Sequence, residues 1–411
     1  MTKRNIAGLL LLSVFAFTTA CGKTAPIQPA PTPTPEAAVS TPTPEPTPTP
    51  DPVAEALASL TTEQKVGQLL VAGILGTDPG EDGAQAVQDY QVGGVILFGR
   101  NVESADQLTG LTNALKELNG DHVPLFLCVD EEGGRVSRMP GEVTDLPSAY
   151  TYGEIYDADL FYSVGEVLAA ECTTFGFNMD FAPVMDVWAH PDNTVIGDRA
   201  YSSDPSRAAN AAAWVAGGMG QAGVIAVGKH FPGHGDTATD SHVELPVVDK
   251  SKEEWLVSDA VPFWMAADSG VPAIMVGHIL MPKIDPDRPA SLSYPLVTEI
   301  LRGELGFGER VVCTDDLTMA AISDTYGMGE AAVLAVEAGC DLLLVCHGED
   351  NLTEARDALL EAVESGRISQ ERLDQSVYRL LSLKGEYGLT NEPVPAPDVA
   401  ALNEQIAAVL P

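Results

Sequence analysis

Three of the chain's seven histidines lie in one short stretch, residues 224–246, which begins as an apolar run. They are His230, His234 and His242, with Asp236 and Asp240 between the last two. A packed core takes apolar side chains, and an ordinary surface loop has no need of so dense a set of titratable groups. The stretch therefore predicts a catalytic or ligand-binding loop that follows a buried strand.

The Asp240-Ser241-His242 triplet is the most informative piece of this loop. In an extended segment residues two apart point to the same side, so the Asp240 carboxylate can bond one imidazole nitrogen of His242 and leave the other free. An aspartate in that position supports the protonated histidine and makes it a proton shuttle near neutral pH. The alternative is a surface loop in which Asp240 caps a turn. His234 and Asp236 are expected to shape the loop's glycine turns rather than to contact a substrate.

Eight apolar, strand-like runs must position these groups. They cover residues 67–74, 93–98, 125–130, 177–187, 224–230, 273–278, 310–315 and 341–346, and helical patterns such as 104–118, 206–221 and 330–338 separate most of them. Continuous apolar strands alternating with helices predict an α/β fold with a parallel sheet, and eight of them predict a (β/α)8 barrel of the TIM type. A doubly wound open sheet is the competing architecture. No GxGxxG turn follows the first run, which weakens the dinucleotide-binding version of that sheet.

Polar residues close five of these runs. They are Asp130 after the third, Asp186 after the fourth, Lys229 and His230 after the fifth, His278 after the sixth, and Asp315 with Asp316 after the seventh. In a barrel the carboxyl ends of all strands meet at one rim, where barrel enzymes hold their chemistry. The pattern therefore predicts an active site at that rim, against the alternative of solvated loop ends.

Composition excludes some partners. The chain has 411 residues, 45% of them hydrophobic, and a net charge of -37. Phosphate binding needs a basic face, so we expect no nucleic-acid partner. The cysteines beyond residue 53 show neither CxxC nor Cys/His spacing and predict buried thiols, not disulfides or a metal site. They are Cys128, Cys172, Cys313, Cys340 and Cys346.

The N-terminus has the layout of a secretory signal. Lys3 and Arg4 precede an apolar run, and Cys21 follows a short segment of small residues. This junction resembles a bacterial lipobox, with Thr where lipoboxes usually have Leu; the alternative is an ordinary signal peptide with a chance cysteine. The Pro/Thr-rich stretch beyond it predicts an extended spacer. We expect a lipoprotein signal at 1–21, a disordered linker at 22–53, a catalytic barrel at 54–390 and a C-terminal tail at 391–411. The protein would be secreted and held to the outer face of the bacterial cell membrane through a lipid on Cys21.

Four motifs in order along the chain resemble glycoside hydrolase family 3 in its β-N-acetylglucosaminidase branch. They read VDEEGGRVSR, NTVIGDRAYS, KHFPGHGDTATDSHVELP and VVCTDDLTMAAI. The similarity covers residues from about 54 to 386. It implies a single-domain barrel enzyme that retains anomeric configuration and removes terminal β-linked N-acetylglucosamine from peptidoglycan fragments or chitooligosaccharides. Such a β-N-acetylhexosaminidase needs no cofactor and no metal.

The resemblance also implies residue roles. Asp315, in preference to Asp316, matches the nucleophile, and His242 matches the general acid/base with Asp240 as its partner. The positions that bind the terminal sugar are matched by Asp130, Arg138, Arg199, Lys229 and His230. In each of these five the alternative is a salt bridge within the barrel rim, most seriously for the two arginines.

Other functions remain open. A set of His230, His234, His242 and Asp240 would suit zinc in a metal-dependent hydrolase, although the DEEGGR and TDD motifs would then have no task. A neutral histidine base admits phosphate, which leaves a phosphorolytic member of the family open. A β-glucosidase is disfavoured by the KHFPGHG-to-DSH loop, and a catalytically silent sugar-binding lipoprotein by the intact Asp315, Asp240 and His242.

Overall fold

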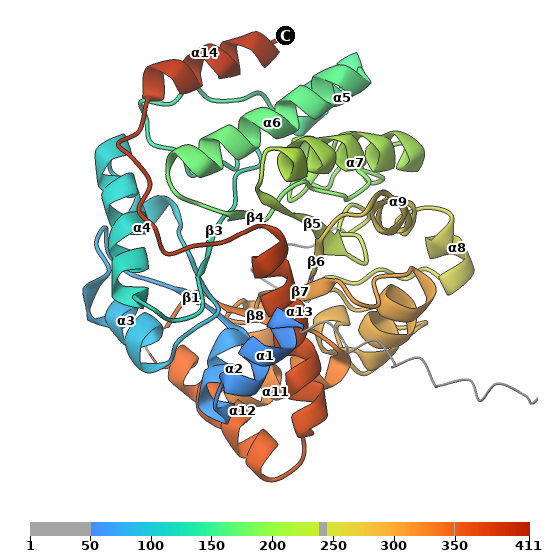
Figure 1. The fold of residues 1–411 in the computed structure, drawn as a ribbon. Coiled ribbons are helices and arrows are strands. Elements are labelled where there is room, and N and C mark those ends of the chain that lie inside the picture. The colour runs from blue at the N-terminus through green and yellow to red at the C-terminus, as the bar shows by residue number, and fades with distance from the viewer. Residues whose placement is uncertain (1–50, 238–244, 349) are drawn as a thin grey trace, which may run out of the picture. The chain divides into compact units, whose positions relative to one another are not determined.

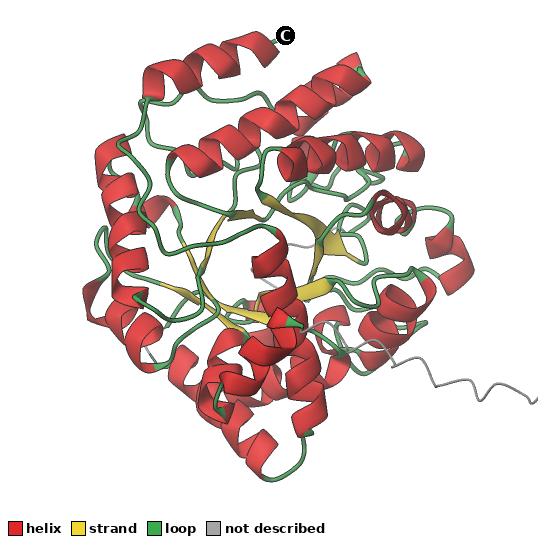
Figure 2. Ribbon diagram, in the orientation of Figure 1, coloured by secondary structure: helices red, strands yellow, loops and turns green. Residues whose placement is uncertain are grey.

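The computed structural model describes residues 51–237, 245–348 and 350–411. The strands of these ranges are all parallel and form a closed barrel in the order β1 to β8, with β8 pairing with β1. Helices surround the strands, which lie at the centre of the view in Figures 1 and 2. The expected TIM-type (β/α)8 barrel is confirmed, and a doubly wound open sheet is excluded because no strand is left at an edge.

The elements follow one another in the expected alternation. The strands are β1 (Leu70–Gly73), β2 (Gly94–Ile96), β3 (Phe126–Val129), β4 (Met179–Asp180), β5 (Ile225–Phe231), β6 (Ala273–Val276), β7 (Val311–Asp316) and β8 (Leu342–Val345). The helices are α1 (Pro52–Ser59), α2 (Thr62–Gln68), α3 (Gly80–Ala84), α4 (Ala105–Asn119), α5 (Ala149–Ile155), α6 (Ala158–Thr174), α7 (Pro205–Gln221), α8 (Lys252–Leu256), α9 (Val261–Ser269), α10 (Ala320–Ser323), α11 (Met328–Ala338), α12 (Asn351–Glu364), α13 (Gln370–Glu386) and α14 (Val399–Val409). A π-helical stretch, η5 (Pro295–Glu304), takes the helix position between β6 and β7.

Burial on both faces explains why the strands read as continuous apolar runs. Every residue of β5 is buried, including Lys229 and His230 near its end. The helices keep one apolar stripe against the strands, and several of them begin at residues whose side chains cap them. Helix α7, for example, follows Asp204, whose side chain accepts the N–H of Arg207, and has Pro205 in its first turn.

Two of the predicted strand runs differ most from the strands of the structure. The first apolar run begins inside α2, because residues 67–68 complete that helix before β1 starts. The fourth run pairs as a strand only over Met179–Asp180. Beyond it the chain continues with a single parallel bridge from Val184 to Lys229, next to Pro183, which has no N–H to donate to a ladder.

The segment expected as a C-terminal tail contains a packed helix. Leu402, Ile406 and Val409 of α14 are buried, and α14 lies along α6 (Figure 1). The described residues from 51 to 411 form one compact unit.

The amino-terminal rim of the barrel is closed by polar contacts of α13. Lys384 Nζ donates to Gln68 Oε1 at 2.8 Å and to the Gly93 carbonyl at 2.9 Å, and it lies 4.5 Å from the centre of the Phe126 ring. Burial lowers the pKa of Lys384 to about 7. These groups join the last large helix to the first strands, so this rim is structural.

The expectation of buried thiols is confirmed. Cys128, Cys172, Cys313, Cys340 and Cys346 are all free and buried. Burial raises the pKa of each thiol, which keeps them in the unreactive protonated form. Within the described ranges no helix combines the length and the apolar character that crossing a bilayer requires.

Three carboxyl groups are buried together behind β3 and β4. Glu131, Glu171 and Asp180 are each at most 1% exposed, and the Glu131 N–H donates to Asp180 Oδ1 at 2.9 Å. Among the described residues, Oε2 of Glu171 and Oδ2 of Asp180 have no hydrogen-bond partner. Burial raises the pKa of Glu131 to about 7, and burial together with the neighbouring carboxylates raises the pKa of Glu171 well above its usual value.

This cluster predicts that stability depends on pH. Because the folded-state pKa values are raised, the folded protein holds protons that the unfolded chain releases, so the stabilisation is present at low pH and lost as pH rises past about 4.5 towards 7. We expect Glu171→Gln to raise the free energy of unfolding by about 1–2 kcal/mol near pH 8 and by less near pH 5. Urea titrations at both pH values measure this. The control is Glu166→Gln, exposed on the same helix, and equal effects of the two variants would contradict the prediction.

Candidate active site

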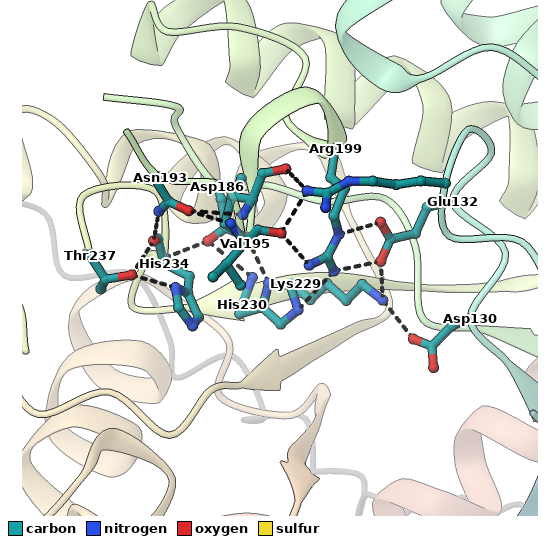
Figure 3. Close-up of polar contacts among 12 residues, drawn as sticks. Asp130, Glu132, Asp186, Asn193, Val195, Arg199, Lys229, His230, His234 and Thr237 are labelled. Carbon is teal, nitrogen blue, oxygen red and sulfur yellow. Dashed lines mark hydrogen bonds and ion pairs between the residues drawn. The ribbon is translucent and has the colours of Figure 1, made fainter. Parts of the chain in front are cut away.

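A buried lysine, a partly buried arginine and two carboxylates form one network at the carboxyl rim (Figure 3). Lys229 Nζ lies 2.6 Å from Asp130 Oδ1 and 2.6 Å from Glu132 Oε1. Glu132 also accepts two hydrogen bonds from Arg199, from Nε at 2.8 Å and from Nη2 at 2.8 Å. The carboxylate of Glu132 therefore joins the end of β5 to the loop that carries Arg199.

The charges of this network fix its protonation. Burial alone would raise the pKa of Glu132, but Lys229 and Arg199 outweigh it and hold that pKa well below its usual range. Burial would lower the pKa of Lys229, and here the two carboxylates reverse the effect and raise it. Glu132, Arg199 and Lys229 are thus charged near neutral pH. Charged groups held rigidly at strand ends make short, directed hydrogen bonds to hydroxyl groups.

Asp186 holds the two described histidines of the loop. His230 Nδ1 lies 2.7 Å from Asp186 Oδ2, and the His234 N–H donates to Asp186 Oδ1 at 2.6 Å. Asp186 is fully buried, and His230 keeps the pKa of its carboxyl low against the effect of burial. The bond to Asp186 therefore fixes the orientation of the His230 ring, whose Nε2 lies 3.5 Å from Arg199 Nη2.

Asp315 and Asp316 are the two carboxylates at the end of β7, and Asp315 is the more exposed of them. Its Oδ1 accepts the Asp316 N–H at 2.8 Å, and the side chain is partly exposed. Asp316, in contrast, is buried and bonds the Thr318 N–H and hydroxyl and the Cys346 N–H. Burial would raise the pKa of Asp315, but His278, His230 and Lys229 lower it further than burial raises it, so the carboxylate stays ionised near neutral pH.

A single cavity of about 530 Å³ brings the predicted groups together. All six predicted site residues that the structure describes line it: Asp130, Arg138, Arg199, Lys229, His230 and Asp315. They come from the ends of β3, β5 and β7 and from the loops after β3 and β4. The expectation that the strand ends converge is confirmed for these residues. The volume lies within the range of about 300–1,000 Å³ that small-molecule sites occupy.

For Arg138 and Arg199 the alternative to sugar binding was a salt bridge within the barrel rim. Arg199 forms such a salt bridge and Arg138 does not. Arg199 forms the bidentate pair with Glu132 and also lines the cavity, so it both braces the rim and faces the site. Arg138 donates from Nη1 to the Ser137 carbonyl at 3.0 Å. No carboxylate in the described part of the chain lies within ion-pair distance of it, which leaves its guanidinium directed at the cavity.

The loop after β5 is described only up to residue 237 and from residue 245. Asp240 and His242 lie outside the described residues, as does Cys21. Asp236 pairs with Lys250 at 3.0 Å, in agreement with a structural role. A side chain at Gly235 would place its Cβ 1.7 Å from the Val187 carbonyl oxygen, so only glycine allows the loop to pack this closely on the chain beyond β4.

The roles of four residues differ from what the sequence indicated. Glu132 was not singled out and Asp186 was named only as the polar end of the fourth run, yet both anchor the network. His234, expected only to shape a turn, lines the cavity as well as bonding Thr237. His278 does not line the cavity: it is buried between Ser291 Oγ and the Asp316 carbonyl, each at 2.8 Å. Its role is to support β7 beneath Asp315.

The zinc alternative finds no complete ligand set in the described ranges. No group of three or more His, Cys, Asp or Glu residues with metal-binding geometry occurs there. His230 directs Nδ1 to Asp186, and the Nδ1 of His234 lies 2.6 Å from Thr237 Oγ1. The two rings lie 6.1 Å apart in an edge-to-face arrangement.

A closed parallel barrel with an ionised carboxylate and a network of buried ion pairs in one rim cavity defines a (β/α)8-barrel enzyme. The model of the glycosyl hydrolase family 3 N-terminal domain matches residues 61–383. The chain belongs to glycoside hydrolase family 3.

Individual relatives agree with this assignment. A β-hexosaminidase of Alkalilimnicola ehrlichii is 41% identical over 285 residues, which cover 68% of this chain and 80% of that protein. A β-hexosaminidase of Nitrosomonas eutropha is 37% identical over 323 residues, covering 76% and 91%. Among solved structures, a family 3 β-N-acetylglucosaminidase from Paenibacillus sp. str. FPU-7 superposes with a TM-score of 0.82 at 41% identity, over 85% of this chain and 68% of that one.

Proposed function

We propose that this glycoside hydrolase is an exo-acting β-N-acetylhexosaminidase that releases terminal N-acetylglucosamine with retention of configuration. The observation that supports it most is the partly exposed Asp315 carboxylate in a cavity that Asp130, Lys229, Arg199 and His230 also line. The relatives that bear the name β-hexosaminidase support the choice of sugar. Peptidoglycan fragments and chitooligosaccharides are the proposed substrates.

The proposed reaction has two steps. In the first, an Asp315 oxygen attacks the anomeric carbon, the glycosidic C–O bond breaks, and His242 gives its proton to the departing oxygen. In the second, His242 takes a proton from water, the water oxygen bonds the anomeric carbon, and the bond to Asp315 breaks. Asp240 would orient His242 and stabilise its protonated form. The low pKa of Asp315 suits the role of nucleophile because an attacking carboxylate must be ionised.

Sugar binding in this proposal rests on the described network. Asp130 and Lys229 present charged acceptor and donor atoms side by side, and ring hydroxyls can both donate and accept. Arg138, Arg199 and His230 line the same cavity and complete the set.

A panel of aryl β-glycosides, assayed with and without EDTA, tests the function. We expect turnover of the N-acetylglucosaminide to exceed that of the glucoside by at least about 100-fold, with no effect of chelation. Preference for the glucoside would contradict the proposal, and loss of activity in EDTA would favour the metal-dependent hydrolase. Added phosphate separates hydrolysis from phosphorolysis, because only phosphorolysis yields the sugar 1-phosphate.

The location of the enzyme is a separate proposal from sequence. Residues 1–21 would direct export, and Cys21 would carry the lipid. The predicted linker of residues 22–53 is too long at its end, because α1 (Pro52–Ser59) already includes residues 52 and 53; the part before α1 would hold the barrel away from the membrane. Incorporation of a labelled fatty acid that is lost in Cys21→Ala is the corresponding test.

A further inference from the structure

A second cavity adjoins the main one between the ends of β1 and β8. Its volume is about 320 Å³, and Cys346 and His347 line both cavities. Asp316 links it to the proposed nucleophile, since its Oδ1 accepts the Cys346 N–H at 3.1 Å and its Oδ2 lies 3.6 Å from His347 Nε2. Asp316, the residue after Asp315, therefore contacts two of the residues that line the second cavity.

The wall between the cavities is an aromatic surface held in place by Arg100. The Phe98 ring, which lines the main cavity, and the His347 ring have centroids 5.2 Å apart. The Arg100 guanidinium lies 4.6 Å above the Phe98 centroid and places Nη1 3.2 Å from His347 Nδ1. Arg100 also donates to the carbonyls of Ile74 and Cys346, so its guanidinium makes its hydrogen bonds within the wall. Aromatic faces of this kind offer large, rigid contact area to the C–H face of a sugar ring.

The lining of the second cavity is apolar and acidic. Leu75 is 55% exposed there, which is high for a leucine in a folded protein and leaves apolar surface available to a ligand. Glu81 and Asp82 supply carboxylates, and Asp82 Oδ2 is fixed by the Leu75 N–H at 2.8 Å. None of the described residues that line this cavity is Lys or Arg. Carboxylates accept hydrogen bonds from hydroxyl and ammonium groups and repel anions.

We infer that the second cavity holds the leaving-group sugar and selects an uncharged or amine-bearing ring over one that carries a carboxylate. The inference rests on the proposed exo-acting function: the main cavity takes the terminal sugar, so the remainder of the substrate must leave through adjoining space. The acidic lining then favours chitooligosaccharide-type substrates over wall fragments whose second sugar bears a lactyl ether acid.

Three substrates test this selection. They are an aryl β-N-acetylglucosaminide, the β-1,4 disaccharide of N-acetylglucosamine, and the same disaccharide with a lactyl ether carboxylate on the second ring. We expect the wild type to show a kcat/KM at least about tenfold higher for the neutral disaccharide than for the acidic one, and Glu81→Lys to lower that ratio by about tenfold. Glu81→Gln should shift it in the same direction by less.

Glu166→Lys, the same charge change on an exposed residue of α6, is the matched control and should leave the ratio within about twofold of the wild type. The aryl glycoside reports an intact catalytic site in each variant. A wild type that prefers the acidic disaccharide, or an unchanged ratio in both Glu81 variants with the aryl glycoside still cleaved, would overturn the inference. If the wild type cleaves none of the three, the proposed function fails and the inference with it.

Discussion

The Asp315→Ala variant is expected to turn over an aryl β-N-acetylglucosaminide at least about 10³-fold more slowly than the wild type, because the group that would form the covalent bond is gone. The neighbouring network of Lys229 and Glu132 does not bond Asp315 directly, so sugar binding should persist. Stopped assays of kcat and KM measure the split between the two effects. A fall in kcat with little change in KM is the expected result.

Asp324→Asn, a change at an exposed aspartate beyond the same strand, is the control and should leave turnover unchanged. Intact-protein mass spectra taken during turnover of a substrate with a good leaving group provide a second readout. The wild type should gain the mass of one glycosyl group and Asp315→Ala should not. An adduct that persists in Asp315→Ala would assign the nucleophile elsewhere.

The His242→Ala variant is expected to lose activity in proportion to how much its leaving group needs a proton. For a dinitrophenyl leaving group, which departs without one, the first step should be nearly unaffected. For an alkyl or sugar leaving group kcat/KM should fall by about 10²–10⁴-fold, the usual contribution of a positioned general acid. A plot of log kcat/KM against leaving-group pKa measures this and should be steeper in the variant.

Ser241→Ala, the adjacent change in the same triplet, is the control and should retain the slope of the wild type. Equal losses in His242→Ala for good and poor leaving groups would argue against a general-acid role. Slow second-step turnover in the variant, with accumulation of the glycosyl-enzyme, is expected as well, since the same imidazole would activate water.

The barrel could be predicted because its strands are buried on both faces, which leaves a continuous apolar run in the sequence. The site could be predicted in outline for a related reason. Strand ends in a closed barrel share one rim, so Asp130, Lys229 and Asp315 had to converge once the eight strands were placed. The end of the short β4 was harder to predict, because its apolar run continues as an extended chain that pairs with β5 at one bridge only.

The supporting contacts were beyond sequence reasoning. Nothing in the DEEGG motif says that Glu132 points towards Lys229 while Glu131 turns away into the carboxyl cluster, although alternation in an extended segment allows it. His278 shows the converse: its position at a strand end resembles that of His230, but only the packing of Ser291 beside it decides that it is buried. Side-chain direction at a strand end therefore depends on residues that other elements of the fold bring alongside it.

The contacts of Lys384 limit when the barrel can close as the chain is synthesised and folds. They join α13 to Gln68, a residue 316 positions earlier, and β8 pairs with β1. During synthesis, which starts at the N-terminus, the barrel therefore cannot close until almost all of the chain has been made. Contacts between residues so far apart in sequence also form slowly. Shortened chains that end before residue 384 should accumulate as unsealed, protease-sensitive species, however complete their substrate pocket is in sequence.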